Sequence, residues 1–253
     1  MDGSQLNLLP NGAQIALSLT ALLLSVILHE IAHGWVALLR GDYTAKSAGR
    51  LSLNPLVHLD PIGSVLLPLL LVLSHSPAVF GWAKPVPVNP ANLYRPRQDD
   101  RLVALAGPAT NLLLGLAAIV ILLLLGLGSK LILAPERGVI LGLPLLLQPT
   151  ILVSSFPGDV FLQVLVQFLK DMVLINFVLA LFNLIPIPPL DGFHVVWSVL
   201  PERLLPKLQS VWQLGWLLFL VLIYTGATDF IIRPGLVAAQ WLLLRGAAWI
   251  GLF

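Results

Sequence analysis

The sequence contains no cysteine and few charged residues. The absence of cysteine excludes disulfide bonds and thiolate metal ligands, but it does not identify the redox compartment. Only 10% of the 253 residues are charged, against about 25% in a typical soluble domain, and 58% are hydrophobic. The net charge of +2 gives no indication of nucleic-acid binding. We therefore expect an all-α membrane protein that crosses the bilayer several times.

The first residues also lack the positive charges that precede the apolar core of a cleavable signal peptide. We therefore expect the first apolar run, at 13–39, to stay in the membrane as an anchor. Apolar spans and short loops take up nearly all of the sequence, which leaves no room for an added soluble module. The prediction is one integral membrane domain over 1–253, with a catalytic core at 13–192 and a C-terminal helix pair at 206–250.

Long apolar runs mark where the chain crosses the membrane, because a spanning helix needs about 20 apolar residues. Clear spans are expected at 13–39, 102–128 and 160–185, and a final helix pair at 208–225 and 230–250. The run at 62–74 is short and contains a proline, so we expect a re-entrant segment there, with a tilted crossing as the alternative. In all, we predict about five to six transmembrane helices. The pattern at 130–158 does not settle the structure of that stretch.

Two short segments, 49–55 and 84–90, alternate apolar and polar residues, which is typical of β-strands. Pro85 and Pro87 cannot donate hydrogen bonds to a neighbouring strand, so the second segment would be an edge strand or an extended arm. We expect both to be extended segments near the cytoplasmic face, with a plain loop as the alternative. An extended edge at 49–55 could hold an unwound substrate strand by β-augmentation.

The charges around the first span predict its orientation. Asp2 is the only charged residue before it, whereas Arg40, Lys46 and Arg50 follow it. The positive-inside rule then places the N-terminus outside and the segment after Leu39 in the cytoplasm. Groups near the end of this span are therefore expected toward the cytoplasmic side.

The same span contains the sequence His29-Glu30-Ile31-Ala32-His33. Positions i and i+4 share a face of a helix, so His29 and His33 can offer imidazole nitrogens to one metal ion. Glu30 lies on an adjacent face, where it can reach a water at the metal without being a ligand. Ionisable groups at membrane depth are costly and usually functional. The alternative is a pair of histidines hydrogen-bonded to neighbouring helices, with Glu30 paired to one of them.

A third ligand is expected where the third clear span ends. Three of the four residues at 186–189 are prolines, which stop the helix and free its last carbonyls. Irregular backbone at membrane depth is tolerated only where it lines a cavity inside the protein. Asp191 is the only acid at this break, so we predict it as the third ligand. The alternative is a turn aspartate preceding Gly192.

Two histidines and one carboxylate leave one position of a tetrahedral zinc open, as in catalytic rather than structural sites. Zinc is preferred over iron or cobalt from the ligand types. Glu30 would act as general base, and an amide near the oxyanion would come from Asn183 or, less favoured, Asn111. His58 is expected to cap or orient a loop, and its functional alternative is to orient a metal ligand.

Two other functions use the same residues. One is a transmembrane metal-ion transporter in which His29, His33 and Asp191 form a relay. The other is an inactive scaffold that binds membrane helices, against which the intact Glu30 argues. The substitution Glu30→Gln separates a protease from a transporter, because only the protease should lose its function while still binding zinc.

The motif at 29–33, together with Asn183…Pro186…Pro188-Pro189-Leu190-Asp191-Gly192, resembles the site-2 protease family of intramembrane zinc metalloproteases. Three further stretches, GRLSLNPLVHLDPIG, FGWAKPVPVNP and AGPATN, are similar to the small prokaryotic branch of that family. The resemblance covers about residues 22–192, and each motif is less specific alone than the set is together.

This resemblance implies one zinc ion held by His29, His33 and Asp191. It implies Glu30 as the general base and Asn183 near the oxyanion. It also implies regulated intramembrane proteolysis, in which membrane-spanning protein substrates are cleaved within the bilayer, here in a prokaryotic plasma membrane. Many members carry a PDZ domain or a nucleotide-sensing domain, and this sequence has room for neither.

Overall fold

The computed structural model describes residues 11–249, with gaps at 67–69, 71–72, 74–81, 128–130, 141–142, 154–159 and 206–213. Most of the predicted re-entrant segment at 62–74 lies outside these described residues. The start of that segment is described as the π-helical stretch η3 (Pro61–Leu66), and beyond it only positions 70 and 73 are described. Whether 62–74 crosses the bilayer or re-enters therefore stays a prediction.

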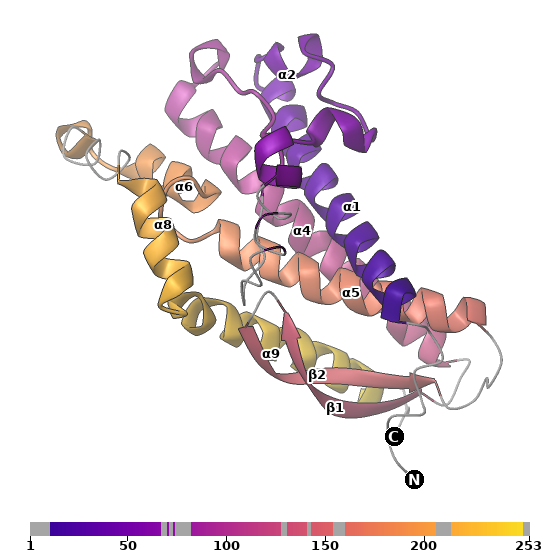
Figure 1. The fold of residues 1–253 in the computed structure, drawn as a ribbon. Coiled ribbons are helices and arrows are strands. Elements are labelled where there is room, and N and C mark those ends of the chain that lie inside the picture. The colour runs from indigo at the N-terminus through magenta and orange to yellow at the C-terminus, as the bar shows by residue number, and fades with distance from the viewer. Residues whose placement is uncertain are drawn as a thin grey trace.

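Three long helices, α1 (Asn11–Leu39), α4 (Pro96–Leu127) and α5 (Val160–Asn183), pack against one another (Figure 1). Within the described residues, these are the three helices long and apolar enough to cross a membrane. They confirm that long apolar helices form where spans were predicted at 13–39, 102–128 and 160–185. Helix α4 begins earlier than predicted because its polar first turn is capped: the Arg95 N–H donates to Asp99 Oδ2 at 2.8 Å, and Pro96 stands at the first helical position.

The remaining helices are shorter or more polar. They are α2 (Thr44–Ser47), η2 (Pro55–His58), η4 (Pro90–Asn92), α6 (Asp191–Val199), η5 (Glu202–Leu204), α8 (Gly215–Tyr224) and α9 (Ala227–Trp249). Helices α8 and α9 correspond to the predicted C-terminal pair, although 206–213 lies outside the described residues. The predicted total of five to six spans is not confirmed, because α8 and α9 are not among the helices that meet the criteria of length and apolarity.

A hairpin occupies the stretch whose structure the sequence left open. Strand β1 (Leu131–Ile140) pairs antiparallel with β2 (Leu143–Val153), and the register shifts between Glu136 and Gly138. Both strands of a two-stranded sheet are edge strands, where proline is tolerated because it need not donate to a neighbour. The fold is thus mainly helical, with one hairpin added to the predicted all-α architecture.

The extended β segments predicted at 49–55 and 84–90 form no strands in the part of the chain that the structure describes. Their backbone bonds to loop atoms and side chains instead. The Lys84 N–H donates to His58 O at 2.9 Å, and the Arg50 guanidinium donates to Lys84 O at 2.6 Å. Pro85 and Pro87 remove the donors that a ladder would need. The strand prediction was therefore wrong, and the loop alternative describes both segments.

The main apolar core lies where α1, α4, α5 and α9 meet. Its buried members are Ala21, Ala118, Ile119, Leu122, Val166, Leu169, Met172, Phe177, Ala239 and Leu243. A smaller cluster of Ala37, Leu93 and Val103 lies at the other end of α1. The polar residues described below lie between these two apolar regions along α1 and α4.

Candidate metal centre

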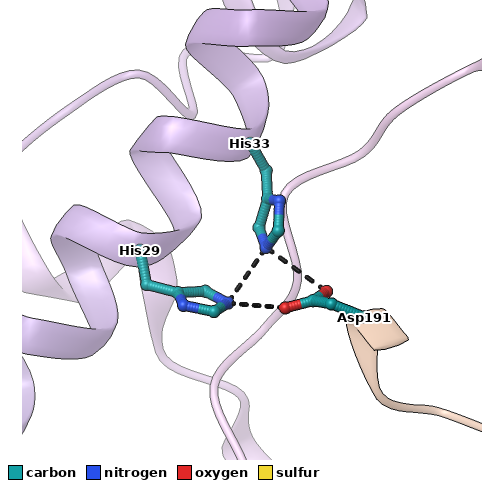
Figure 2. Close-up of side chains that lie close together, drawn as sticks. All are labelled: His29, His33 and Asp191. Carbon is teal, nitrogen blue, oxygen red and sulfur yellow. Dashed lines mark hydrogen bonds and ion pairs between the residues drawn. The ribbon is translucent and has the colours of Figure 1, made fainter. Parts of the chain in front are cut away.

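Three side chains from distant parts of the sequence converge between α1 and the start of α6 (Figure 2). His29 Nε2 lies 2.9 Å from His33 Nε2 and 3.1 Å from Asp191 Oδ2. Asp191 Oδ1 lies 3.4 Å from His33 Nε2. The structure thus brings together the three residues that the sequence suggested as ligands, with their ligand atoms within 4.8 Å of one another.

The outer nitrogens of both imidazoles are already engaged. His29 Nδ1 lies 2.5 Å from Asn111 Oδ1, and His33 Nδ1 lies 2.7 Å from the backbone oxygen of Val103. A carbonyl oxygen can only accept, so each Nδ1 carries a proton and donates it. The amide of Asn111 is oriented by its other bonds, because its Nδ2 donates to Asn176 Oδ1 at 2.8 Å. In the neutral, metal-binding form of each histidine, Nε2 therefore presents its lone pair toward Asp191.

This donor set fits a divalent cation. His29 and His33 are 6% and 9% exposed, so water does not readily solvate their lone pairs. Asp191 Oδ2 is buried and has no hydrogen-bond partner, although it lies close to His29 Nε2. Lone pairs that face one another in a buried site repel unless a positive charge lies between them. Two imidazole nitrogens and a carboxylate are ligands that Zn²⁺ accepts, with room for a fourth.

The carboxylate of Asp191 lies within 3.4 Å of both imidazoles. An ionised carboxylate is the form that binds a metal. Asp191 is also the first residue of α6, where the helix dipole favours a negative charge.

A buried network of polar side chains is hydrogen-bonded to His29 through its Nδ1. Ser25, Asn111 and Asn176 come from α1, α4 and α5, and each is 0% exposed. Asn176 Nδ2 donates to Ser25 Oγ and to Met172 O, both at 2.8 Å. Residues that hold the second nitrogen of a ligating histidine fix its tautomer and ring orientation. Asn111 was proposed from the sequence as an accessory residue, and the structure places it in contact with His29.

Sequence reasoning missed Ser25 and Asn176. The available signal was their polarity inside apolar spans and, for Ser25, its position one turn before His29 on the same helix face. Asn176 could not be assigned because its partners lie on two other helices. The pairing of α5 with α1 is a long-range contact that the sequence does not encode locally.

The backbone of α4 forms one wall of the site at Gly107. A Cβ at this position would lie 2.5 Å from His29 Nε2 and 2.5 Å from His33 Nε2. Real side chains do not approach so closely, so only glycine lets α4 pack here. The small residues of the AGPATN stretch were expected to allow close helix packing, and at Gly107 that packing is against the two histidines themselves.

Two contacts hold α6, and with it Asp191, against the beginning of α4. The Arg97 guanidinium donates to the backbone oxygens of Trp197, at 3.2 Å, and Leu200, at the end of α6. His194 Nδ1 lies 3.4 Å from Asp100 Oδ2. The positive charge at the carboxyl end of α6 also suits the helix dipole. The position of Asp191 is thus set by α4 as well as by the break after α5.

The other predicted site residues lie outside this cluster. Glu30 Oε2 accepts a hydrogen bond from the Val86 N–H at 2.7 Å. Asn183 Nδ2 donates to Leu179 O, one turn back on α5, at 2.9 Å. His58 is buried, and its Nε2 lies 2.7 Å from Ser52 O.

Comparison with known proteins places the chain in a family. The model of Peptidase family M50 matches residues 17–223. A Bacillus subtilis protein named "Putative zinc metalloprotease YwhC" is 35% identical over 225 residues, which are 88% of this chain and 87% of that protein. A Mycolicibacterium smegmatis protein named "Putative zinc metalloprotease Rip2" is 30% identical over 207 residues, 82% of this chain and 66% of that protein. No solved structure matches the chain.

The chain belongs to Peptidase family M50, the site-2 protease family. As a member it is a membrane-embedded zinc metalloprotease, and the transporter alternative is not favoured. The three apolar helices agree with a membrane protein. The family acts in general on membrane-protein substrates within the bilayer.

Proposed function

We propose that His29, His33 and Asp191 hold the catalytic zinc and that Glu30 is the general base for peptide hydrolysis. The observation that carries this proposal is the convergence of two Nε2 atoms, whose rings are held through Nδ1, with an Asp191 oxygen that has no hydrogen-bond partner. When bound, zinc polarises a carbonyl and lowers the pKa of water. The protein's own contribution is to hold three ligands in fixed orientations and to limit access by bulk water.

Glu30 neighbours His29 in the sequence but takes no part in the cluster of ligand atoms. In the proposed reaction its carboxylate takes the proton of the attacking water and later gives that proton to the leaving amine. One carboxylate oxygen, Oε2, accepts from the Val86 N–H, which leaves Oε1 to exchange protons.

Asn183 is the proposed oxyanion donor, as the family resemblance implies. The amide of Asn111 is occupied by His29, Ser25 and Asn176 and serves the metal ligand instead. Asn183 Nδ2 has two hydrogens and donates one of them to Leu179 O, so the other can donate to the substrate oxygen.

We further propose that the whole chain is one catalytic domain with five to six spans and a re-entrant segment at 62–74. The charges after α1 favour an active site toward the cytoplasmic side of a prokaryotic plasma membrane. The substrates would be membrane-spanning proteins cleaved in regulated intramembrane proteolysis.

The deciding experiment compares Glu30→Gln with wild type in proteoliposomes that contain single-span membrane proteins as substrates. We expect Glu30→Gln to keep one zinc per chain, measured by elemental analysis, and to lose about 100-fold or more in cleavage rate. Glu202→Gln is the matched control, since its side chain is 85% exposed. Cleavage by Glu30→Gln at the wild-type rate would contradict the assigned base, and a wild-type protein without zinc would contradict the ligand set.

A further inference from the structure

The carboxylate of Glu30 is held by a backbone segment rather than by another side chain. The Val86 N–H donates to Glu30 Oε2 at 2.7 Å, and Val86 is 7% exposed. Val86 lies in the loop segment 84–89, which we call the strap. The strap meets α1 at Glu30 and Gly34, which are neighbours in sequence of the proposed ligands His29 and His33.

Both ends of the strap are fastened. At its start, Lys84 donates its N–H to His58 O at 2.9 Å and accepts from the Arg50 guanidinium at 2.6 Å. At its end, the Asn89 N–H donates to Asp42 Oδ2 at 2.7 Å. Asp42 is 0% exposed. These bonds fix the two sides of Val86 independently of Glu30.

The prolines of the strap leave few donors. Pro85 and Pro87 have no N–H, so the Val86 amide stands alone between them. A residue that precedes proline also favours extended backbone, which restrains both Lys84 and Val86. The sequence thus presents one isolated N–H to Glu30.

The side chain of Val86 packs against α1 at Gly34. A Cβ at Gly34 would lie 2.9 Å from Val86 Cγ1 and 2.6 Å from Leu51 Cδ2, so the missing side chain of Gly34 makes room for both. Gly34 is four residues after Glu30, on the same face of α1. Val86 thus contacts the same face of α1 twice, at Gly34 through its side chain and at Glu30 through its N–H.

We propose that the backbone amide of Val86 is a positioning group for Glu30. A glutamate side chain on a helix has several rotamers, and restricting them costs entropy that this hydrogen bond offsets. With Oε2 held by Val86, Oε1 keeps one direction in which to receive and return a proton. The proposal rests on the assignment of Glu30 as the base, and it adds the group that orients Glu30.

The kinetic test compares Val86→Pro with Val86→Ala. Val86→Pro removes the N–H in a segment that already tolerates proline, whereas Val86→Ala keeps the N–H and removes only side-chain contacts. We expect Val86→Pro to lower kcat about 10- to 100-fold, as for a lost hydrogen bond to a charged group, with KM and zinc content near wild type. Val86→Ala, which keeps the N–H, should lose clearly less kcat than Val86→Pro.

The outcomes separate this proposal from the function on which it rests. If Glu30→Gln is inactive but Val86→Pro has the same kcat as Val86→Ala, Glu30 is the base and Val86 does not position it. If Glu30→Gln is fully active, the base itself is wrongly assigned. Loss of zinc in Val86→Pro would also count against the proposal, because it would show a general disturbance of the site.

Hydrogen exchange of the strap amides gives a measurement that needs no activity and no folded Val86→Pro variant. Of residues 84–87, only Lys84 and Val86 have exchangeable amides. In Glu30→Ala, the Val86 amide should exchange at least about tenfold faster than in wild type, since a full hydrogen bond to a carboxylate is lost. The Lys84 amide, which is bonded to His58 O, should not change. An unchanged Val86 amide would overturn the proposal, because burial alone would then explain its protection.

Discussion

The same three helices carry two regions of opposite character. Toward one end, α1, α4 and α5 meet through aliphatic side chains such as Ala21, Ile119 and Leu122. Nearer the start of α4, the three helices meet through Asn111, whose partners are Asn176 and His29. Both regions are buried, so the difference between them lies in the chemistry of the contacts.

The two regions impose different requirements on the sequence. Dispersion contacts between aliphatic side chains are not directional, so a core of this kind accepts substitutions that conserve volume. A buried amide or imidazole must meet its partner at hydrogen-bonding distance, since an unpaired polar group there is costly. We therefore expect substitutions of similar size to affect stability in the apolar region and metal binding in the polar region.

The sharpest comparison uses two glycines of α4. A Cβ at Gly107 would meet His29 and His33 at 2.5 Å, whereas a Cβ at Gly115 would meet the ring of Phe177 at 2.8 Å. We expect Gly107→Ala to abolish stoichiometric zinc binding and cleavage, because the two imidazoles cannot keep their orientation. Gly115→Ala should bind zinc normally, because the Phe177 ring can move without affecting the ligands. Elemental analysis and the cleavage assay measure both effects.

Equal zinc content in the two glycine variants would remove the basis of the comparison. It would show that the histidines can rearrange as easily as the aromatic ring does. Thermal unfolding of each variant in the same detergent is the control, because a variant that does not fold cannot report on the metal site.

A second pair compares polar and apolar side chains on the same helix. Asn111→Ala removes the acceptor for His29 Nδ1, so we expect zinc to bind about 10- to 100-fold more weakly. Ile119→Val, which changes a residue that is 4% exposed, should cost about 1 kcal/mol of stability and leave zinc affinity unchanged. Competition with a fluorescent chelator measures the affinity, and thermal unfolding measures the stability.

This pair would break the comparison if Ile119→Val weakened zinc binding as much as Asn111→Ala does. The polar network would then be only one part of a uniformly sensitive bundle. Asn176→Ala provides a further check: it leaves the Asn111–His29 contact in place but removes the acceptor of Asn111 Nδ2, so its effect on zinc should be intermediate.

The sequence predicted the parts of the molecule that depend on local patterns. Apolar runs predicted α1, α4 and α5, and the spacing of His29 and His33 placed both on one helix face. The proline break singled out Asp191 because it is the only acid there. In each case the evidence lies within a few residues, or within one run of helical length.

Features that depend on distant partners could not be predicted. The alternation at 84–90 indicated a strand, but no neighbouring strand is present in the described chain, and its amides bond instead to Glu30, His58 and Asp42. The closeness of Gly107 to the histidines also depends on how α4 lies against α1. Small residues indicated only that some helix packs closely there.

The smallest expected effect concerns a polar cluster beyond the end of α1. Asp42 accepts hydrogen bonds from the Thr44 N–H, the Thr44 hydroxyl, the Asn89 N–H and the Asn92 amide. Burial opposes its charge, but these bonds outweigh burial and lower the pKa of Asp42 below its usual value. A lowered pKa means that the carboxylate stabilises the fold fully above the unfolded pKa of about 3.9 and loses this contribution as the pH falls through the lower folded value.

We expect Asp42→Asn to lower stability by about 1–2 kcal/mol at pH 7 and to leave zinc content unchanged. The difference from wild type should stay constant from pH 7 to about pH 5 and shrink below about pH 4, as Asp42 of the wild type becomes protonated. Thermal unfolding across this range measures it. Asp42 lies outside the spans, so water can replace part of what the substitution removes, which keeps the loss of stability small. A larger loss at Asp42, or a difference that grows on acidification, would show that location relative to the membrane does not set the cost of breaking a polar cluster.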